Sequence, residues 1–176
     1  MPERLLFQQH PDGLDVSLFL DEILIRQLTA DNPLEKLHHG NIASFCTVLE
    51  GISHFLYLVW NAQHERTISR FEMELQAEVD KYIMATSLLA EQSGGSIPRN
   101  LHRSLFEKIS YHKHLSHTEY QRYYLANWYA RRYCYNLHKQ LMTTPDCVNL
   151  TREIRRFYRL VQRQKLTRIK SLPVLH

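Results

Sequence analysis

The sequence predicts an all-α protein: a single-domain bundle of five to six helices that spans residues 1–176. The chain holds only 5 Gly and 6 Pro, so few residues interrupt helices. Apolar residues recur every three or four positions over long stretches, and no convincing run alternates as a half-buried strand would. A chain of this length buries roughly 70% of the surface that its unfolded form exposes, so one domain needs no disulfide or metal for stability.

The N-terminal part begins with an expected irregular lead-in at residues 1–12. Apolar residues at helical spacing follow Asp15 and continue to Leu28, and acidic residues at a helix start suit the helix dipole. Asn32 then precedes a proline and stands three residues before Glu35, which is the order of a capped helix start. One helix is therefore expected after Asp15, and a second from Pro33 that bends at Gly40 and continues into the helix at residues 42–63.

Two consecutive helices within residues 42–89 form the predicted centre of the fold. Residues 42–63 carry a core-facing apolar stripe, and polar side chains lie on its flank rather than opposite to it. The next helix opens with Ser69 and Glu72, the spacing of a capping box in which each side chain satisfies a backbone amide of the other residue. The start of that helix is well defined by these two residues.

The C-terminal half continues with a flexible break at residues 93–96 and a helix that starts at Pro98. Ser116 and Glu119 form a second capping box, and a helix rich in tyrosine follows over residues 117–142. The last expected element is a basic amphipathic terminal helix at residues 149–171.

Charge is distributed unevenly along the chain, which has a formal net charge of +4. Residues 1–150 hold 14 Lys and Arg against 17 Asp and Glu, whereas residues 151–176 hold 8 against 1. One side of the terminal helix is lined by a row of arginines spaced four, three and four residues apart: Arg152, Arg156, Arg159 and Arg163. This row predicts a partner surface for nucleic acid or for an acidic protein, to which each arginine would add a salt-dependent contribution.

A second set of polar side chains falls on predicted core faces, where a bare charge costs several kcal/mol. The set comprises Glu50, His54, Glu78, Asn127, Arg131 and His138. We expect Glu78 to pair with Arg131. The set is interpreted either as a structural hydrogen-bonding network or as a functional pocket, since carboxylate, imidazole and guanidinium groups in a low-dielectric site have the perturbed acidities that acid–base chemistry needs.

A metal-dependent version of this site would use two pairs of residues spaced four apart on adjacent helices: Glu50 with His54, and Glu74 with Glu78. Carboxylate-bridged di-iron bundles use a Glu-x-x-His motif on two helices, and this chain lacks that repeated motif. No metal and no cofactor are therefore expected.

Arg131 or Arg132 followed by His138 resembles the Arg-x(4–6)-His motif of HEPN-domain ribonucleases, which are also small helical proteins. The resemblance covers this one short motif. It implies an RNA-cleaving site in which the arginine stabilises the phosphate and His138 is the general base, with the site completed across a dimer.

These observations favour a non-enzymatic binding or regulatory module, with an enzyme built on the inner polar set as the alternative. The three cysteines form no ligand or disulfide spacing, and residues 1–12 lack the apolar segment of a secretory signal, so a cytoplasmic location is expected. Glu50 and His54 near the middle of an apolar helix oppose a membrane span. Apolar residues on helix backs, such as Phe55 and Leu58, make a homodimer an alternative state.

Overall fold

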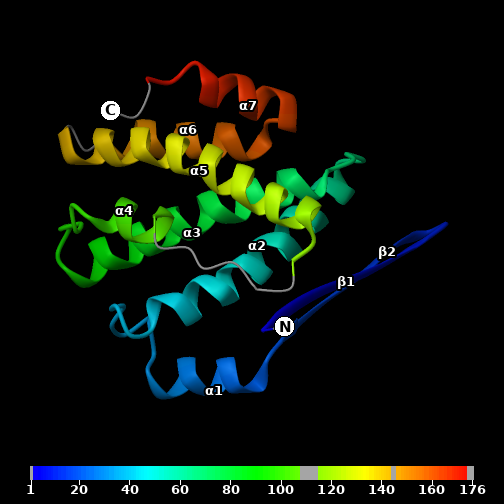
Figure 1. The fold of residues 1–176 in the computed structure, drawn as a ribbon, viewed down its shortest axis with the longest axis horizontal. Coiled ribbons are helices and arrows are strands. Elements are labelled where there is room, and N and C mark those ends of the chain that lie inside the picture. Colours follow the sequence, from blue (N-terminus) through cyan, green and yellow to red (C-terminus); the bar gives the residue numbers. More distant parts are fainter. Residues whose placement is uncertain (1, 108–114, 144–145, 174–176) are drawn as a thin grey trace. The chain divides into compact units, whose positions relative to one another are not determined.

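The computed structural model describes residues 2–107, 115–143 and 146–173, which form seven helices and one two-stranded sheet (Figure 1). The prediction of a mainly helical protein is confirmed. The finer prediction of an all-α bundle with five to six helices is wrong, because the chain begins with a β-hairpin and the described residues form more helices than expected.

The hairpin consists of β1 (Glu3–His10) and β2 (Gly13–Leu20), paired antiparallel from Glu3 opposite Leu20 to His10 opposite Gly13. It replaces the irregular lead-in at residues 1–12 and the first part of the helix expected after Asp15, whose later part is present as α1 (Glu22–Ala30). The physical reason is a period of two along β2, where half-buried residues alternate with exposed ones. Pro11 and Asp12, two residue types that favour turns, form the connection between the strands.

The chain divides into two compact units. The first comprises residues 1–67 and 80–98 and holds 5 Lys and Arg against 11 Asp and Glu; we call it the acidic unit. The second comprises residues 68–79 and 99–176 and holds 17 Lys and Arg against 7 Asp and Glu; we call it the basic unit. Helix α3 (Arg70–Gln92) contributes its first half to the basic unit and its second half to the acidic unit.

The acidic unit contains the hairpin, α1 (Glu22–Ala30), α2 (Ile42–Gln63) and the second half of α3. The predicted bounds of the helix at 42–63 are confirmed. The hairpin packs on α2 where Gly51 leaves room, because a Cβ at this position would lie 3.0 Å from Leu18 Cδ1. The absence of a side chain therefore lets the strands approach the helix.

The capped start predicted at Asn32 forms a turn instead of a helix. The Asn32 side chain does accept a hydrogen bond from the Leu34 amide at 3.0 Å. However, the side chain of Gln92 donates to the carbonyls of Pro33 and Leu34 and accepts from the amide of Leu37. These tertiary hydrogen bonds take backbone groups that a helix would otherwise use.

By length and composition alone, α2 passes the test for a helix that crosses a membrane, and it does so alone among the described residues. Its most apolar stretch has a mean hydropathy of 1.6, and 28% of that stretch is buried. Core helices of soluble proteins pass the same test, so the finding is compatible with a soluble protein.

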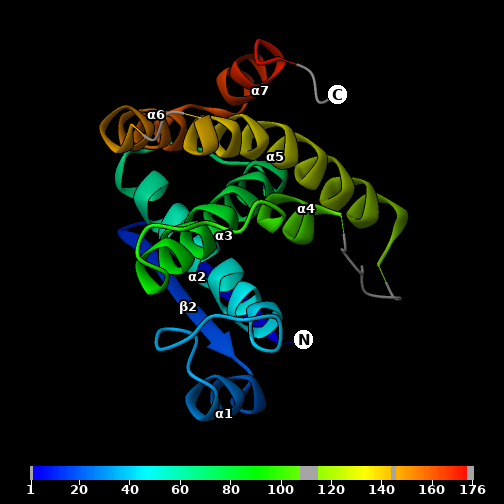
Figure 2. The ribbon, with the colours of Figure 1, turned by 90° about the vertical axis from the view of Figure 1, so that its left-hand side faces the viewer.

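The basic unit contains the first half of α3, α4 (Leu101–Phe106), α5 (His117–Thr143), α6 (Cys147–Arg159) and α7 (Gln162–Lys170). Both predicted capping boxes contribute helix starts here: Ser69 Oγ accepts from the Glu72 amide at 3.0 Å, and Ser116 Oγ accepts from the Glu119 amide at 3.3 Å. Helix α6 lies beside α5, as both ribbon views show (Figures 1 and 2).

The expected single helix at 149–171 is two helices, separated by extended backbone at Leu160 and Val161. The amide of Val161 is capped by the side chain of Gln164, which stabilises the start of α7. The break lets α7 bury its own side chains, Lys165 and Ile169, on a different line from those that α6 buries.

Candidate functional site

The outer side of α6 presents arginines over two helical turns around a hollow of about 780 Å³. We call this surface the arginine face; it is lined by Cys147, Val148, Thr151, Arg152, Arg155, Arg156, Arg159 and Leu160. All four arginines are exposed. None of the described lining residues is a carboxylate, so the face is a concentrated site of positive charge.

Packing on the opposite side of α6 fixes which residues face outward. Phe157 is buried and its ring stacks on Tyr133 of α5, with centroids 3.9 Å apart and an interplanar angle of 20°. The one acidic residue within α6, Glu153, binds the Arg168 side chain of α7 at 2.9 Å. Because Phe157 and Glu153 are engaged with the rest of the basic unit, the arginines are directed away from it.

The start of α6 is set by Asp146, whose Oδ1 accepts a hydrogen bond from the Asn149 amide at 3.0 Å. This hydrogen bond to the backbone stabilises the charged carboxylate and lowers the pKa of Asp146 below its usual value. The cap begins the helix immediately before the arginine face.

The predicted arginine row is divided by the break between α6 and α7. Arg152, Arg156 and Arg159 lie on the arginine face, whereas Arg163 is an exposed residue in the first turn of α7. The prediction omitted Arg155, which also lines the hollow. Its position three residues after Arg152 and four before Arg159 placed it on the same side of the helix, so the spacing was a usable signal.

The inner polar set predicted from the sequence is distributed over both units. Glu50 and His54 belong to the acidic unit, and Glu78, Asn127, Arg131 and His138 belong to the basic unit. In the acidic unit, Glu50 forms an ion pair of 3.0 Å with Lys81, in which both side chains are largely shielded from solvent. His54 is buried on α2.

In the basic unit, Arg131 pairs with Glu107 at 2.6 Å and not with Glu78 as expected. Glu78 is half-buried on α3, and the side-chain nitrogen of Asn127 makes no hydrogen bond to the part of the chain that the structure describes. The expected pairing failed because α4 brings Glu107 to Arg131 from 24 positions away in the sequence.

His138 lies near a second buried histidine, His102, which the sequence reasoning missed. The two rings are 6.1 Å apart, and each Nε2 lies within hydrogen-bond distance of a backbone carbonyl: Arg99 at 3.1 Å for His138, and Arg131 at 2.8 Å for His102. Burial lowers the pKa of His102; the hydrogen bond to the Arg131 carbonyl opposes this change only in part, and the nearby His138 adds to it. His102 lies on the same helix side as Phe106, and that spacing placed it on the apolar side of the predicted helix.

These contacts give Glu50, Arg131 and His138 partners, whereas the buried Nε2 of His54 and side-chain nitrogen of Asn127 make no hydrogen bond to the described part of the chain. Arg132, the other arginine of the HEPN-like motif, donates hydrogen bonds to the carbonyls of Lys170 and Leu172 at the end of α7. Glu74, a ligand in the metal hypothesis, pairs with Arg122 at 3.5 Å within the basic unit. Arg131 and Arg132 thus link α5 to the end of α4 and to the end of α7.

Neither a family model, nor a curated protein, nor a solved structure matches this chain.

Proposed function

We propose that the protein is a non-catalytic binding module that contacts nucleic acid through the arginine face. The observation that carries this proposal is the exposure of four arginines on two turns of α6, around a hollow whose lining holds no carboxylate. From Arg152 to Arg159 the helix rises about 10 Å, at 1.5 Å per residue. Consecutive phosphates of a nucleic acid strand lie within reach of such a row.

The chemistry of the side chains supports this choice. All the cations on the arginine face are arginine, whose planar guanidinium group binds a phosphate through two parallel hydrogen bonds. An acidic protein surface is the alternative partner, because carboxylates accept the same pair of hydrogen bonds. A phosphate backbone supplies negative charge at regular intervals along its whole length, which suits a helical row of cations better than scattered carboxylates do.

The test is binding of a fluorescent oligonucleotide, measured by anisotropy over a range of salt concentrations. Contacts to four phosphates give a slope of log affinity against log salt of about −3 for a single strand and about −3.6 for a DNA duplex. The variant R152Q/R155Q/R156Q/R159Q is expected to lose most of the binding and most of this slope.

The matched control is R70Q/R99Q/R103Q/K139Q, which removes the same charge from exposed positions elsewhere in the basic unit. The control is expected to keep the salt slope. Equal losses in the two variants would show that net charge alone attracts the oligonucleotide. Tighter binding to polyglutamate than to the oligonucleotide would favour the acidic protein as partner.

A further inference from the structure

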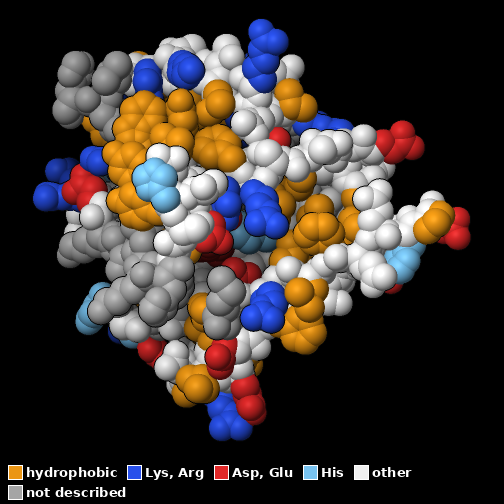
Figure 3. Space-filling model, turned by 45° about the vertical axis from the view of Figure 1, so that its right-hand side comes forward, with side chains coloured by type: hydrophobic (Ala, Val, Ile, Leu, Met, Phe, Trp, Pro, Cys, Tyr) orange, Lys and Arg blue, Asp and Glu red, His pale blue; other side chains and the backbone are white. Residues whose placement is uncertain are grey.

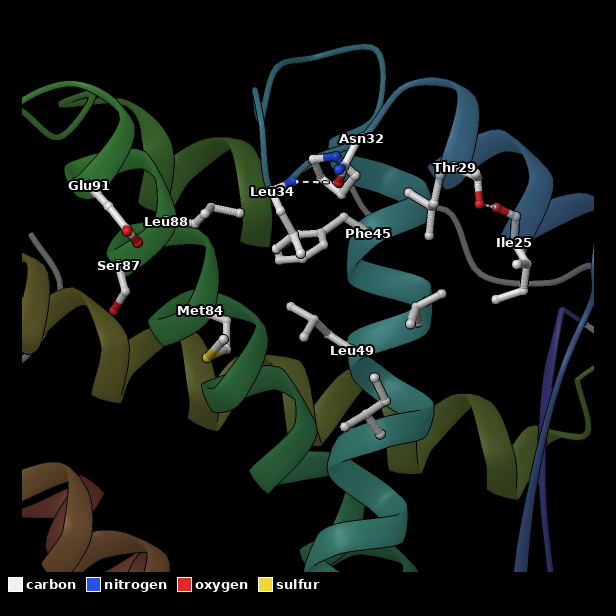
Figure 4. Close-up of a pocket in the computed structure, with 14 residues that line it drawn as sticks. Ile25, Thr29, Asn32, Leu34, Phe45, Leu49, Met84, Ser87, Leu88 and Glu91 are labelled. Atoms are coloured by element: carbon white, nitrogen blue, oxygen red, sulfur yellow. Dashed lines mark hydrogen bonds between the residues drawn. The ribbon is translucent and has the colours of Figure 1, made fainter.

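The acidic unit contains an open apolar groove of about 670 Å³ between α2 and the second half of α3, flanked by α1 and the turn after it (Figure 4). Leu34, Phe45, Leu49, Met84 and Leu88 are drawn around its centre. Ten of its 14 lining residues are apolar, and the others are Thr29, Asn32, Ser87 and Glu91. The groove shares no residue with the arginine face.

The groove leaves large apolar side chains in contact with water. Leu34 is 68% exposed, Met84 46% and Ile25 42%. Exposed hydrophobic side chains also gather in groups on the face drawn in Figure 3. The three named above differ because they share one concave surface with residues of the apolar helix α2. Contiguous apolar surface in a groove is typical of a site where a partner docks.

The charge around the groove selects a cationic partner. Glu91 is the one charged residue in the lining, and its carboxylate has no partner among the residues that the structure describes. The unit that carries the groove holds 11 Asp and Glu against 5 Lys and Arg. A positive side chain on the occupant would pair with Glu91 and be attracted by the surrounding field.

The shape of the groove selects a helix. Two neighbouring helices leave a furrow between their side-chain ridges, and a third helix fills it at an interaxial distance of about 8–10 Å. A helix that presents apolar residues at positions i, i+3 or i+4, and i+7 places its anchors along such a furrow. Met84 in the lining adapts to different apolar side chains because it is unbranched.

From these observations we propose that the groove binds a cationic amphipathic helix of a partner protein. Its apolar stripe would lie on Phe45, Leu49 and Met84, and a Lys or Arg would lie beside Glu91. Helix α6 of a second copy is not suited to this role. It is cationic, but its apolar side is already covered, since Phe157 is 1% exposed and stacks on Tyr133.

The test measures the binding of three synthetic peptides, all of the same length, to the full chain. One has a leucine stripe with lysine at the remaining positions, one has the same stripe with glutamate, and one has the lysines without the stripe. We expect only the first to bind, as measured by isothermal titration and by the helical signal in circular dichroism. Equal binding of the first and third peptides would overturn the proposal, because the apolar groove would then not be used.

Variants of the groove localise the binding. L34N/M84Q changes two exposed side chains, so the fold is expected to persist, and affinity for the first peptide should fall about tenfold or more. E91K should weaken it about two- to fivefold, as expected for one exposed ion pair, and improve binding of the glutamate peptide. V148N is the control, because Val148 is as exposed as Leu34 but lies in the arginine face. Its affinity for the first peptide should equal that of the wild type.

Unchanged affinity in L34N/M84Q would overturn the proposal, as would a dimer in sedimentation that dissociates on this substitution. The oligonucleotide assay distinguishes peptide binding in the groove from nucleic-acid binding by the arginine face. L34N/M84Q should keep the nucleic-acid binding of the original protein, whereas loss of oligonucleotide binding in the arginine variant should leave peptide binding intact.

Discussion

Replacement of Phe157 by alanine tests whether packing of α6 on α5 is what presents the arginines. The Phe157 ring is buried and stacks on Tyr133. The ammonium group of Lys165, which belongs to α7, lies 5.1 Å from the centroid of the ring. Removal of a buried phenylalanine costs about 3–5 kcal/mol, from lost transfer free energy and the cavity that remains. Small domains are stable by roughly 5–15 kcal/mol in total, so the loss is a large fraction of the stability of the basic unit.

The assay is chemical denaturation of the wild type and of F157A, followed by hydrogen exchange of the amides in α6. We expect the midpoint to fall and α6 amides to exchange faster, together with weaker oligonucleotide binding although every arginine is retained. F157L should be milder because it keeps most of the apolar volume. V148A is the exposed control and should change stability by less than about 0.5 kcal/mol. A loss below about 1 kcal/mol in F157A would refute the role assigned to the ring.

Three further predictions follow from individual contacts. Burial lowers the pKa of His102 in the folded state, so the unfolded state binds a proton first as the pH falls below about 6.5. The free energy of unfolding should therefore decrease below this pH by at most about 1.4 kcal/mol per pH unit. Denaturation curves of H102Q at pH 5 to 7.5 should show a weaker dependence on pH. G51L should detach the hairpin and speed amide exchange in β1 and β2, whereas G13A, where a Cβ meets nothing within 4 Å, should leave the exchange rates unchanged. Q92A removes partners of three backbone groups and should destabilise the acidic unit by about 2–3 kcal/mol in urea unfolding, more than Q92E, which keeps the acceptor for Leu37.

Local signals in the sequence predicted much of the helical part. The bounds of α2 followed from its apolar stripe, and the serine and glutamate pairs at 69/72 and 116/119 marked the starts of α3 and α5. These signals act within a few residues, so they survive in the folded chain whatever else packs around them.

The hairpin was missed because the same residues satisfy two periods. Val16, Phe19, Leu20 and Ile23 suit a helix, whereas Leu14, Val16, Leu18 and Leu20 suit one side of a strand. Pairing with β1 and packing near Gly51 decide between them, and both are contacts between distant residues. The partner of Arg131 was missed for the same reason, since the sequence does not reveal that α4 carries Glu107 to it.

The fold places the basic residues differently from what their order in the sequence indicates. Counted in sequence order, the basic excess belongs to residues 151–176 alone. Counted by compact unit, 17 of the 22 Lys and Arg lie in the basic unit, because residues 99–150 join the terminal helices while most of the acidic residues gather in the other unit. Many of the basic side chains have partners, such as Arg131 with Glu107 and Arg168 with Glu153. The arginine face brings four arginines together, and none of its described lining residues is a carboxylate. This local excess, rather than net charge, is why substitutions on α6 should differ in effect from a control of equal charge.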